Sequence, residues 1–205
     1  MRLIQERHGN DGEKTNIQNT GNNQGVMSKV INGNVTINNI RGPRISSLLS
    51  EVVQSLGDLC CNDEYIEELP DFREYKPDEK LRYNDVIKYK EIIKEFSAYY
   101  VMCDRYLNMY DNSHIGSKAK ILKNIHLWYL EARGSILADN KEAGLSDMEI
   151  IRRNSDRIID MIKERIQKRI YDSEEQDNTY EDIELGTACF TCYCFMECKI
   201  LEKPI

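Results

Sequence analysis

The sequence lacks the features that direct a chain into a membrane or out of the cell. It contains no uninterrupted apolar run of about 18 residues, which a transmembrane helix requires. Its first residues, Met1 to Arg7, have no apolar stretch of the kind that a secretory signal peptide carries. The sequence therefore predicts a cytoplasmic protein that makes no contact with membranes.

Proline is also scarce, with 4 among 205 residues. Because proline interrupts helices, this scarcity favours a mostly helical chain. Hydrophobic residues make up 40% of the sequence and charged residues 31%, a balance typical of a soluble domain with a core of its own. The formal net charge of -7 argues against a protein that binds nucleic acid over its whole surface, but it is compatible with a local basic face.

The common motifs of catalysis are absent too. The sequence has no GxGxxG, no GxxxxGK[ST], no HExxH and no GxSxG. Its three histidines, His8, His114 and His126, lie far apart and in different predicted elements. We therefore expect no enzymatic activity and no cofactor.

Cysteine, by contrast, is present seven times, an odd number that favours free thiols in a reducing compartment. Cys189 and Cys192 form a CxxC, a spacing that binds zinc in other settings. On a helix, however, Cys194 and Cys198 lie on another face, so four thiols would not converge on one ion. The spacing therefore predicts buried thiols and no metal site.

The N-terminal part of the chain differs in composition from everything after it. Residues 1–25 are predicted to form a flexible arm, because residues 16–25 are rich in Asn, Gln and Gly and offer little apolar surface to bury. Residues 26–42 are predicted to form a β-hairpin around Asn32-Gly33, a dipeptide that tolerates the positive φ values of a tight turn.

Both faces of the predicted hairpin carry apolar side chains, and both of its edges are open. A lone two-stranded hairpin is only marginally stable in water, so we expect it to pair with another copy of the chain. The alternatives are packing against its own helical domain, or an amyloid-like stack held by asparagine ladders. The hairpin residues expected at an interface are Val26, Val30, Ile31, Val35 and Ile37.

Residues 43–205 are predicted to form a helical bundle, which makes the fold class all-α with a hairpin and an arm in front. Apolar residues recur at spacings of three and four, the pattern of helices that face a core. Ser146 and Glu149 have the spacing of a capping box, and Asp78 is a candidate N-cap. About five helices are expected, over residues 44–69, 78–110, 117–138, 146–171 and 180–200.

The last predicted helix is apolar on most of its faces, which indicates burial in the bundle or at a contact between chains. We assign three of its aromatic residues to such an interface: Phe190, Tyr193 and Phe195.

The helix predicted over 146–171 has a basic face. Asp156, Asp160 and Glu164 dilute this face at helical spacing, which favours a solvated surface with intrahelical ion pairs. The alternative is a docking surface for an acidic partner or for nucleic acid, but no aromatic residues interleave the cations as nucleic-acid binding would favour. The arginines of this face are Arg152, Arg153, Arg157, Arg165 and Arg169.

Two segments together resemble a known module. Asn19 to Gly25 running into Val30 to Ile37, and the C-terminal Tyr193 to Pro204, are similar to the C-terminal module of effector proteins in bacterial ABC-three-component conflict systems. This class includes Lamassu-type anti-phage defence, in which an SMC-like ABC ATPase, a small middle component and an effector act together. The resemblance covers about residues 16–205 and implies a non-enzymatic module that oligomerises the effector or tethers it to the complex.

The sequence departs from the effector pattern in one respect. No nuclease, protease or hydrolase domain is found ahead of the hairpin, so we expect any effector activity to come from another protein. One alternative is that the chain is the small middle component itself. Others are a stand-alone helical protein unrelated to defence, or an enzyme or regulator with a thiol site at Cys60-Cys61 or among the C-terminal thiols.

Overall fold

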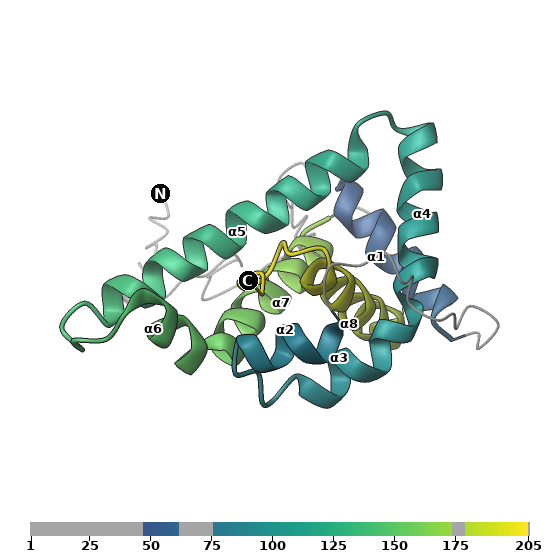
Figure 1. Ribbon diagram of the computed structural model, residues 1–205. Helices are drawn as coiled ribbons and strands as arrows, with labels where there is room; N and C mark the ends of the chain where they lie inside the picture. The colour runs from purple at the N-terminus through teal and green to yellow at the C-terminus, as the bar shows by residue number, and fades with distance from the viewer. Residues whose placement is uncertain (1–46, 62–75, 174–178, 205) are drawn as a thin grey trace, which may run out of the picture. The chain divides into compact units, whose positions relative to one another are not determined.

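The computed structural model describes residues 47–61, 76–173 and 179–204, all of which belong to one compact unit, Arg44–Ile205. These residues form α-helices and one short 3₁₀-helix, with no strand among them, so the all-α prediction for the bundle is confirmed. The arm predicted at 1–25 and the hairpin predicted at 26–42 lie outside the described residues. The elements in Figure 1 are α1 (Leu48–Leu59), α2 (Pro77–Tyr83), α3 (Lys90–Phe96), η2 (Ser97–Tyr99), α4 (Tyr100–Ser113), α5 (Ser117–Asp139), α6 (Asp147–Arg153), α7 (Ser155–Tyr171) and α8 (Tyr180–Met196).

Helix α8 lies at the centre of the bundle and packs against α1, α3, α4 and α7 (Figure 1). Its apolar residues cover most of its circumference, and almost all of its C-terminal half is buried. A capping box between Thr179 and Asp182 starts the helix: the Thr179 hydroxyl accepts from the Asp182 N–H, and the Asp182 carboxylate accepts from the Thr179 N–H. The sequence pattern thus predicts the burial of α8 correctly.

Two glycines let α1 and α8 approach each other closely. A Cβ placed on Gly186 of α8 would lie 1.9 Å from the Val53 carbonyl oxygen of α1. A Cβ placed on Gly57 of α1 would lie 2.1 Å from the Asp182 carbonyl oxygen of α8. The backbones of the two helices therefore touch where no larger residue fits.

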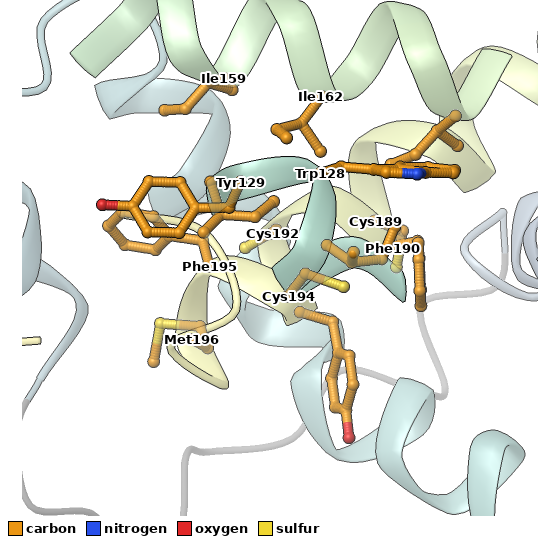
Figure 2. Close-up of a cluster of buried hydrophobic side chains, with 14 of the residues drawn as sticks. Trp128, Tyr129, Ile159, Ile162, Cys189, Phe190, Cys192, Cys194, Phe195 and Met196 are labelled. Atoms are coloured by element: carbon orange, nitrogen blue, oxygen red, sulfur yellow. The ribbon is translucent and has the colours of Figure 1, made fainter. Parts of the chain in front are cut away.

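The remaining helices close the core around α8. Figure 2 shows Trp128 and Tyr129 of α5 in one cluster with Ile159 and Ile162 of α7 and with the side chains of α8. The long helix expected at 117–138 is present as Ser117–Asp139. Its predicted inward residues, including Ile125 and Trp128, are buried.

The helix predicted over 78–110 is instead divided into α2, α3, η2 and α4. Asp85 has φ 52°, a left-handed conformation that no α-helix continues through. The Asp156 carboxylate of α7 then accepts the backbone N–H groups of Ile87 and Lys88, at 3.2 and 3.0 Å, just before α3 begins. The predicted N-cap is also displaced, because α2 begins at Pro77 and Asp78 lies inside it.

The helix predicted over 146–171 is likewise two helices, which meet at Asn154. Its first turn follows the prediction, because the Glu149 carboxylate accepts the Ser146 N–H at 2.9 Å in a capping box. The last helix ends at Met196 rather than at residue 200, and α1 ends at Leu59 rather than at residue 69. Of the helices in the described ranges, none is both long enough and apolar enough to cross a bilayer.

Candidate functional site

An open groove of about 930 Å³ lies where α2, α3 and the turn between them meet the junction of α6 and α7. The break at Asp85 positions one wall, because it turns the chain from α2 towards α7. The break at Asn154 positions the other wall, because it separates the cations of α6 from α7. The lining residues are Asp78, Leu81, Arg82, Asp85, Val86, Ile87, Lys90, Lys94, Arg152, Arg153, Ser155 and Asp156.

We call this site the docking groove. Its cationic side chains outnumber its carboxylates. Two of its three carboxylates already have partners. Asp78 pairs with Lys94 at 3.3 Å between Oδ1 and Nζ, and Asp156 accepts backbone N–H groups of the turn before α3. The groove is therefore locally positive on a chain whose formal net charge is -7.

Arg152 is held in a fixed position in the groove wall. Its Nε donates to the Tyr83 carbonyl oxygen at 2.7 Å, and its guanidinium lies 5.0 Å from the centre of the Tyr83 ring. An arginine fixed in this way loses less conformational entropy when it binds an anion than a freely rotating side chain does.

The groove also has an apolar component. Leu81 and Val86 are buried beneath it, whereas Ile87 is 80% exposed. A single exposed isoleucine is ordinary on a protein surface, but here it lies among cations in a concave site. The groove therefore offers both charge and apolar contact to a ligand.

The structure divides the basic face that the sequence predicts on residues 146–171. Arg152 and Arg153 line the groove. Arg157 instead pairs with Asp139 at 3.6 Å, and Arg165 pairs with Glu131. Arg165 and Arg169 also lie over the Trp128 ring, at 4.9 and 5.9 Å from its centre.

Sequence reasoning does not find the other residues of the groove. Arg82, Lys90 and Lys94 lie on a segment that the sequence predicts as one continuous helix. The interruption of that helix at Asp85, which depends on contacts with α7, brings them to face α6. Ile87 was the one local signal of this surface. It does not follow the apolar stripe predicted for residues 78–110, and it is exposed in the structure.

The three aromatic residues assigned to an interface lie in the core of a single chain. Phe190, Tyr193 and Phe195 are 0%, 1% and 1% exposed. Tyr193 stacks on Tyr100, with ring centres 5.2 Å apart, and donates from its hydroxyl to Asp104 at 2.7 Å. The chain's own helices therefore bury these side chains, whereas the sequence analysis placed them at a contact between chains. The other five assigned residues, Val26, Val30, Ile31, Val35 and Ile37, lie outside the described residues.

The C-terminal segment after α8 is fastened to the bundle. The buried Lys80 of α2 donates from Nζ to the Phe195 carbonyl oxygen and, at 2.9 Å, to the Ile200 carbonyl oxygen. Its ammonium lies 4.4 Å from the centre of the Phe195 ring, and burial lowers the pKa of Lys80 to about 8. Lys80 therefore caps the end of α8, and its amine has a structural role.

Polar contacts at Glu202 continue this attachment. Asn84 donates from Nδ2 to the Glu202 carbonyl oxygen at 2.9 Å and accepts the Glu202 N–H at 3.0 Å. The Glu202 carboxylate accepts the Tyr129 hydroxyl at 2.7 Å and Arg133 Nε at 3.0 Å. The segment is therefore an integral part of the bundle and does not serve as a free docking peptide.

Three of the buried thiols, those of Cys60, Cys189 and Cys194, offer little for nucleophilic chemistry. Cys103 and Cys189 are buried with their sulfur atoms 3.2 Å apart. The hydrogen bond with Cys189 and burial raise the pKa of Cys60, the hydrogen bond with Cys103 raises that of Cys189, and burial raises that of Cys194. Since the thiolate is the reactive form, these three groups are poor nucleophiles.

The other candidate chemistry is dispersed. Within the described ranges, no group of three or more His, Cys, Asp or Glu side chains is arranged to hold a metal ion. His114 is exposed and stacks on Tyr110 with ring centres 4.5 Å apart, and His126 is also exposed. His8 lies outside the described residues.

The chain was compared with protein-family models, curated proteins and solved structures, and none of the three comparisons found a match.

Proposed function

We propose that the chain is a non-enzymatic module that assembles with copies of itself and tethers a partner protein in a bacterial ABC/SMC-like anti-phage defence complex. The observation that carries this proposal is the docking groove, which is open, fixed by the backbone breaks at its two walls, and lined by both cations and an exposed apolar side chain. Such a surface suits recognition of a protein segment rather than turnover of a small substrate.

The chemistry of the described residues supports a tethering role over a thiol enzyme. The thiols of Cys60, Cys189 and Cys194 have raised pKa values, and the amine of Lys80 is buried against two carbonyl oxygens. The groove itself contains no cysteine and no histidine. Its one hydroxyl, that of Ser155, is buried and donates to the Asp85 carbonyl oxygen at 3.3 Å, so it is not paired with a histidine base.

The resemblance to effector modules of ABC-three-component systems supplies the biological setting of the proposal. It rests on the segments Asn19 to Ile37 and Tyr193 to Pro204. In that setting the chain would position an effector relative to the ATPase.

Co-expression with the proteins encoded by neighbouring genes tests the proposal. We expect an SMC-like ABC ATPase among them, and we expect the full chain to copurify with the ATPase or with the effector in a fixed ratio. Removing the chain should abolish protection against phage while leaving the ATPase soluble. An effector neighbour that carries its own oligomerisation module would identify the chain as the middle component. Failure to copurify with any neighbour would contradict the proposal.

A further inference from the structure

The docking groove concentrates positive charge on an acidic protein. Four of its cationic side chains are exposed, namely those of Arg82, Lys90, Lys94 and Arg153, and Arg152 is half-buried. The formal net charge of the whole chain is -7, so this local excess of positive charge is opposite in sign to the charge of the chain as a whole. Opposite charge in a concave site attracts an anionic ligand and orients it.

The carboxylates of the groove do not cancel this excess. Asp78 pairs with Lys94 on the next helix, and Asp156 accepts the N–H groups of Ile87 and Lys88. Asp85 is the third carboxylate. The hydrogen bonds to Asp156 leave its negative charge in place, so five cations face three carboxylates and the groove keeps a formal excess of two positive charges.

The surroundings of these cations favour a protein ligand over nucleic acid. Ile87 is 80% exposed beside them, and an apolar side chain contributes nothing to binding a phosphate backbone. The Tyr83 ring, which would otherwise be available to stack on a base, lies against the Arg152 guanidinium at 5.0 Å. The net charge of -7 also repels a long polyanion more strongly than a short peptide.

We propose that the docking groove binds an acidic segment of a partner protein, with carboxylates on Arg82, Lys90, Arg152 and Arg153 and one apolar side chain against Ile87. This inference rests on the proposed tethering function and names the chemistry of the partner. Arg152, fixed by its bond to the Tyr83 carbonyl, provides the pre-oriented contact. The exposed cations set the rate and the salt dependence of association.

Selection from a random peptide library displayed on phage, with the full chain as bait, tests the proposal and does not require an identified partner. The double variant Lys90→Glu/Arg153→Glu serves as counter-bait, because both side chains are exposed in the groove. The matched control is Lys123→Glu/Lys141→Glu, which makes the same change in net charge at exposed lysines outside the groove. The best peptide is then synthesised and titrated against each protein by fluorescence anisotropy.

We expect the selected peptides to be rich in Asp and Glu and to share one apolar position. Their affinity should fall about tenfold or more in Lys90→Glu/Arg153→Glu, which corresponds to about 1.4 kcal/mol, and much less in the control pair. Ile87→Ser should weaken binding several-fold without changing the fold, and should have no effect on a peptide whose apolar residue is replaced by serine.

Three results would overturn the proposal: no peptide enriched, enriched peptides without acidic residues, or equal losses in the groove and control variants. Single- and double-stranded DNA of similar charge are titrated in parallel, and DNA binding lost only in the groove variant would assign the groove to nucleic acid instead. If the groove variants lose the peptide but still copurify with the ATPase, the groove assignment stands and its partner is another protein. If the chain copurifies with no neighbour while peptide binding holds, the proposed defence function alone fails.

Discussion

Lys80 shows how a single buried side chain fixes the end of the central helix. Its side chain has 0% exposure and donates to the carbonyl oxygens of Phe195, in the last turn of α8, and of Ile200, in the segment after it. Lys80 therefore ties the C-terminal segment to the end of the helix. Burial disfavours the charged form and lowers the pKa of Lys80 to about 8. The contact therefore stabilises the chain differently at different pH values.

Lys80→Met is expected to lower the free energy of unfolding, because the Ile200 carbonyl oxygen loses the Lys80 donor, at about 1–3 kcal/mol. The Phe195 carbonyl oxygen keeps the Cys198 N–H at 3.2 Å. The loss should increase with pH. The lysine has a pKa of about 8 in the folded chain and 10.5 in the unfolded chain, so between these values the unfolded chain binds more protons. In this window the natural chain therefore becomes more stable as pH rises, by up to about 3 kcal/mol relative to the variant.

Denaturant unfolding of both proteins at about pH 7 and pH 9.5 measures this change, and subtracting the variant removes the titrations that the two proteins share. Lys90→Met makes the same substitution at an exposed lysine and serves as the control. A stability difference that stays constant across this range would refute the role assigned to the buried amine.

Gly186 gives a second test at the residue scale. Gly186→Ala should destabilise the chain by about 1–3 kcal/mol, because the new Cβ would lie 1.9 Å from the Val53 carbonyl oxygen. Gly134→Ala is the matched control, since Gly134 lies in α5 with nothing within 4 Å of a new Cβ. That change should stabilise the chain by about 0.5–1 kcal/mol. Thermal unfolding distinguishes the two, and equal effects would argue against close contact between α1 and α8.

The thiols provide a third test, which bears on the enzyme alternative. Cys61 is exposed, whereas Cys103, Cys189 and Cys194 are buried. Iodoacetamide should therefore modify Cys61 in the folded protein and reach the buried three only in denaturant, as peptide mass mapping would record. Rapid alkylation of a buried thiol in the folded chain would instead favour a thiol-based activity.

At the scale of elements, α8 carries the largest share of the core. Phe190→Ala should lower stability by about 3–5 kcal/mol, because Phe190 is 0% exposed and its ring lies in the central cluster (Figure 2). A single domain often has only about 5–15 kcal/mol in total, so we expect loss of helicity and a sharply lower Tm by circular dichroism. Intact helicity with a smaller particle mass would instead place Phe190 at a contact between chains.

The elements differ in how far their own sequence determines them. Residues 117–138 are predictable because their apolar residues recur at helical spacing without interruption, and α5 spans Ser117–Asp139. The break at Asp85 is not predictable, because it depends on Asp156 of α7 accepting the N–H groups before α3. The capping box at Ser146 is visible in the sequence, but the division of that helix at Asn154 is not.

The candidate site follows the same rule. Arg152 and Arg153 belong to a basic face that the sequence displays. Their counterparts Arg82 and Lys90 face them only because the chain turns at Asp85. The buried Lys80 escapes prediction for a similar reason, since its partners lie at the other end of the chain. Site residues that share a local sequence pattern can be predicted from one sequence, whereas site residues that only tertiary contacts bring together cannot.

At the scale of the whole molecule, the proposed self-association would depend on residues 26–42. Their sequence predicts a hairpin with apolar side chains on both faces, including Val30 and Val35 on one of them. The core of a single chain buries Phe190, Tyr193 and Phe195. The hairpin residues therefore remain the predicted contact between copies. The proposed assembly module has to form this contact between copies before it can hold a partner.

Light scattering on the full chain and on the Val30→Asp/Val35→Asp variant tests this claim most directly, with circular dichroism to confirm that the helices are unchanged. We expect the natural chain to have a mass that is a multiple of 24.0 kDa. The variant should have the mass of a single chain, because two carboxylates would be buried without partners in the paired hairpin. A natural chain that measures 24.0 kDa at all concentrations would contradict the account of this protein as an assembly module.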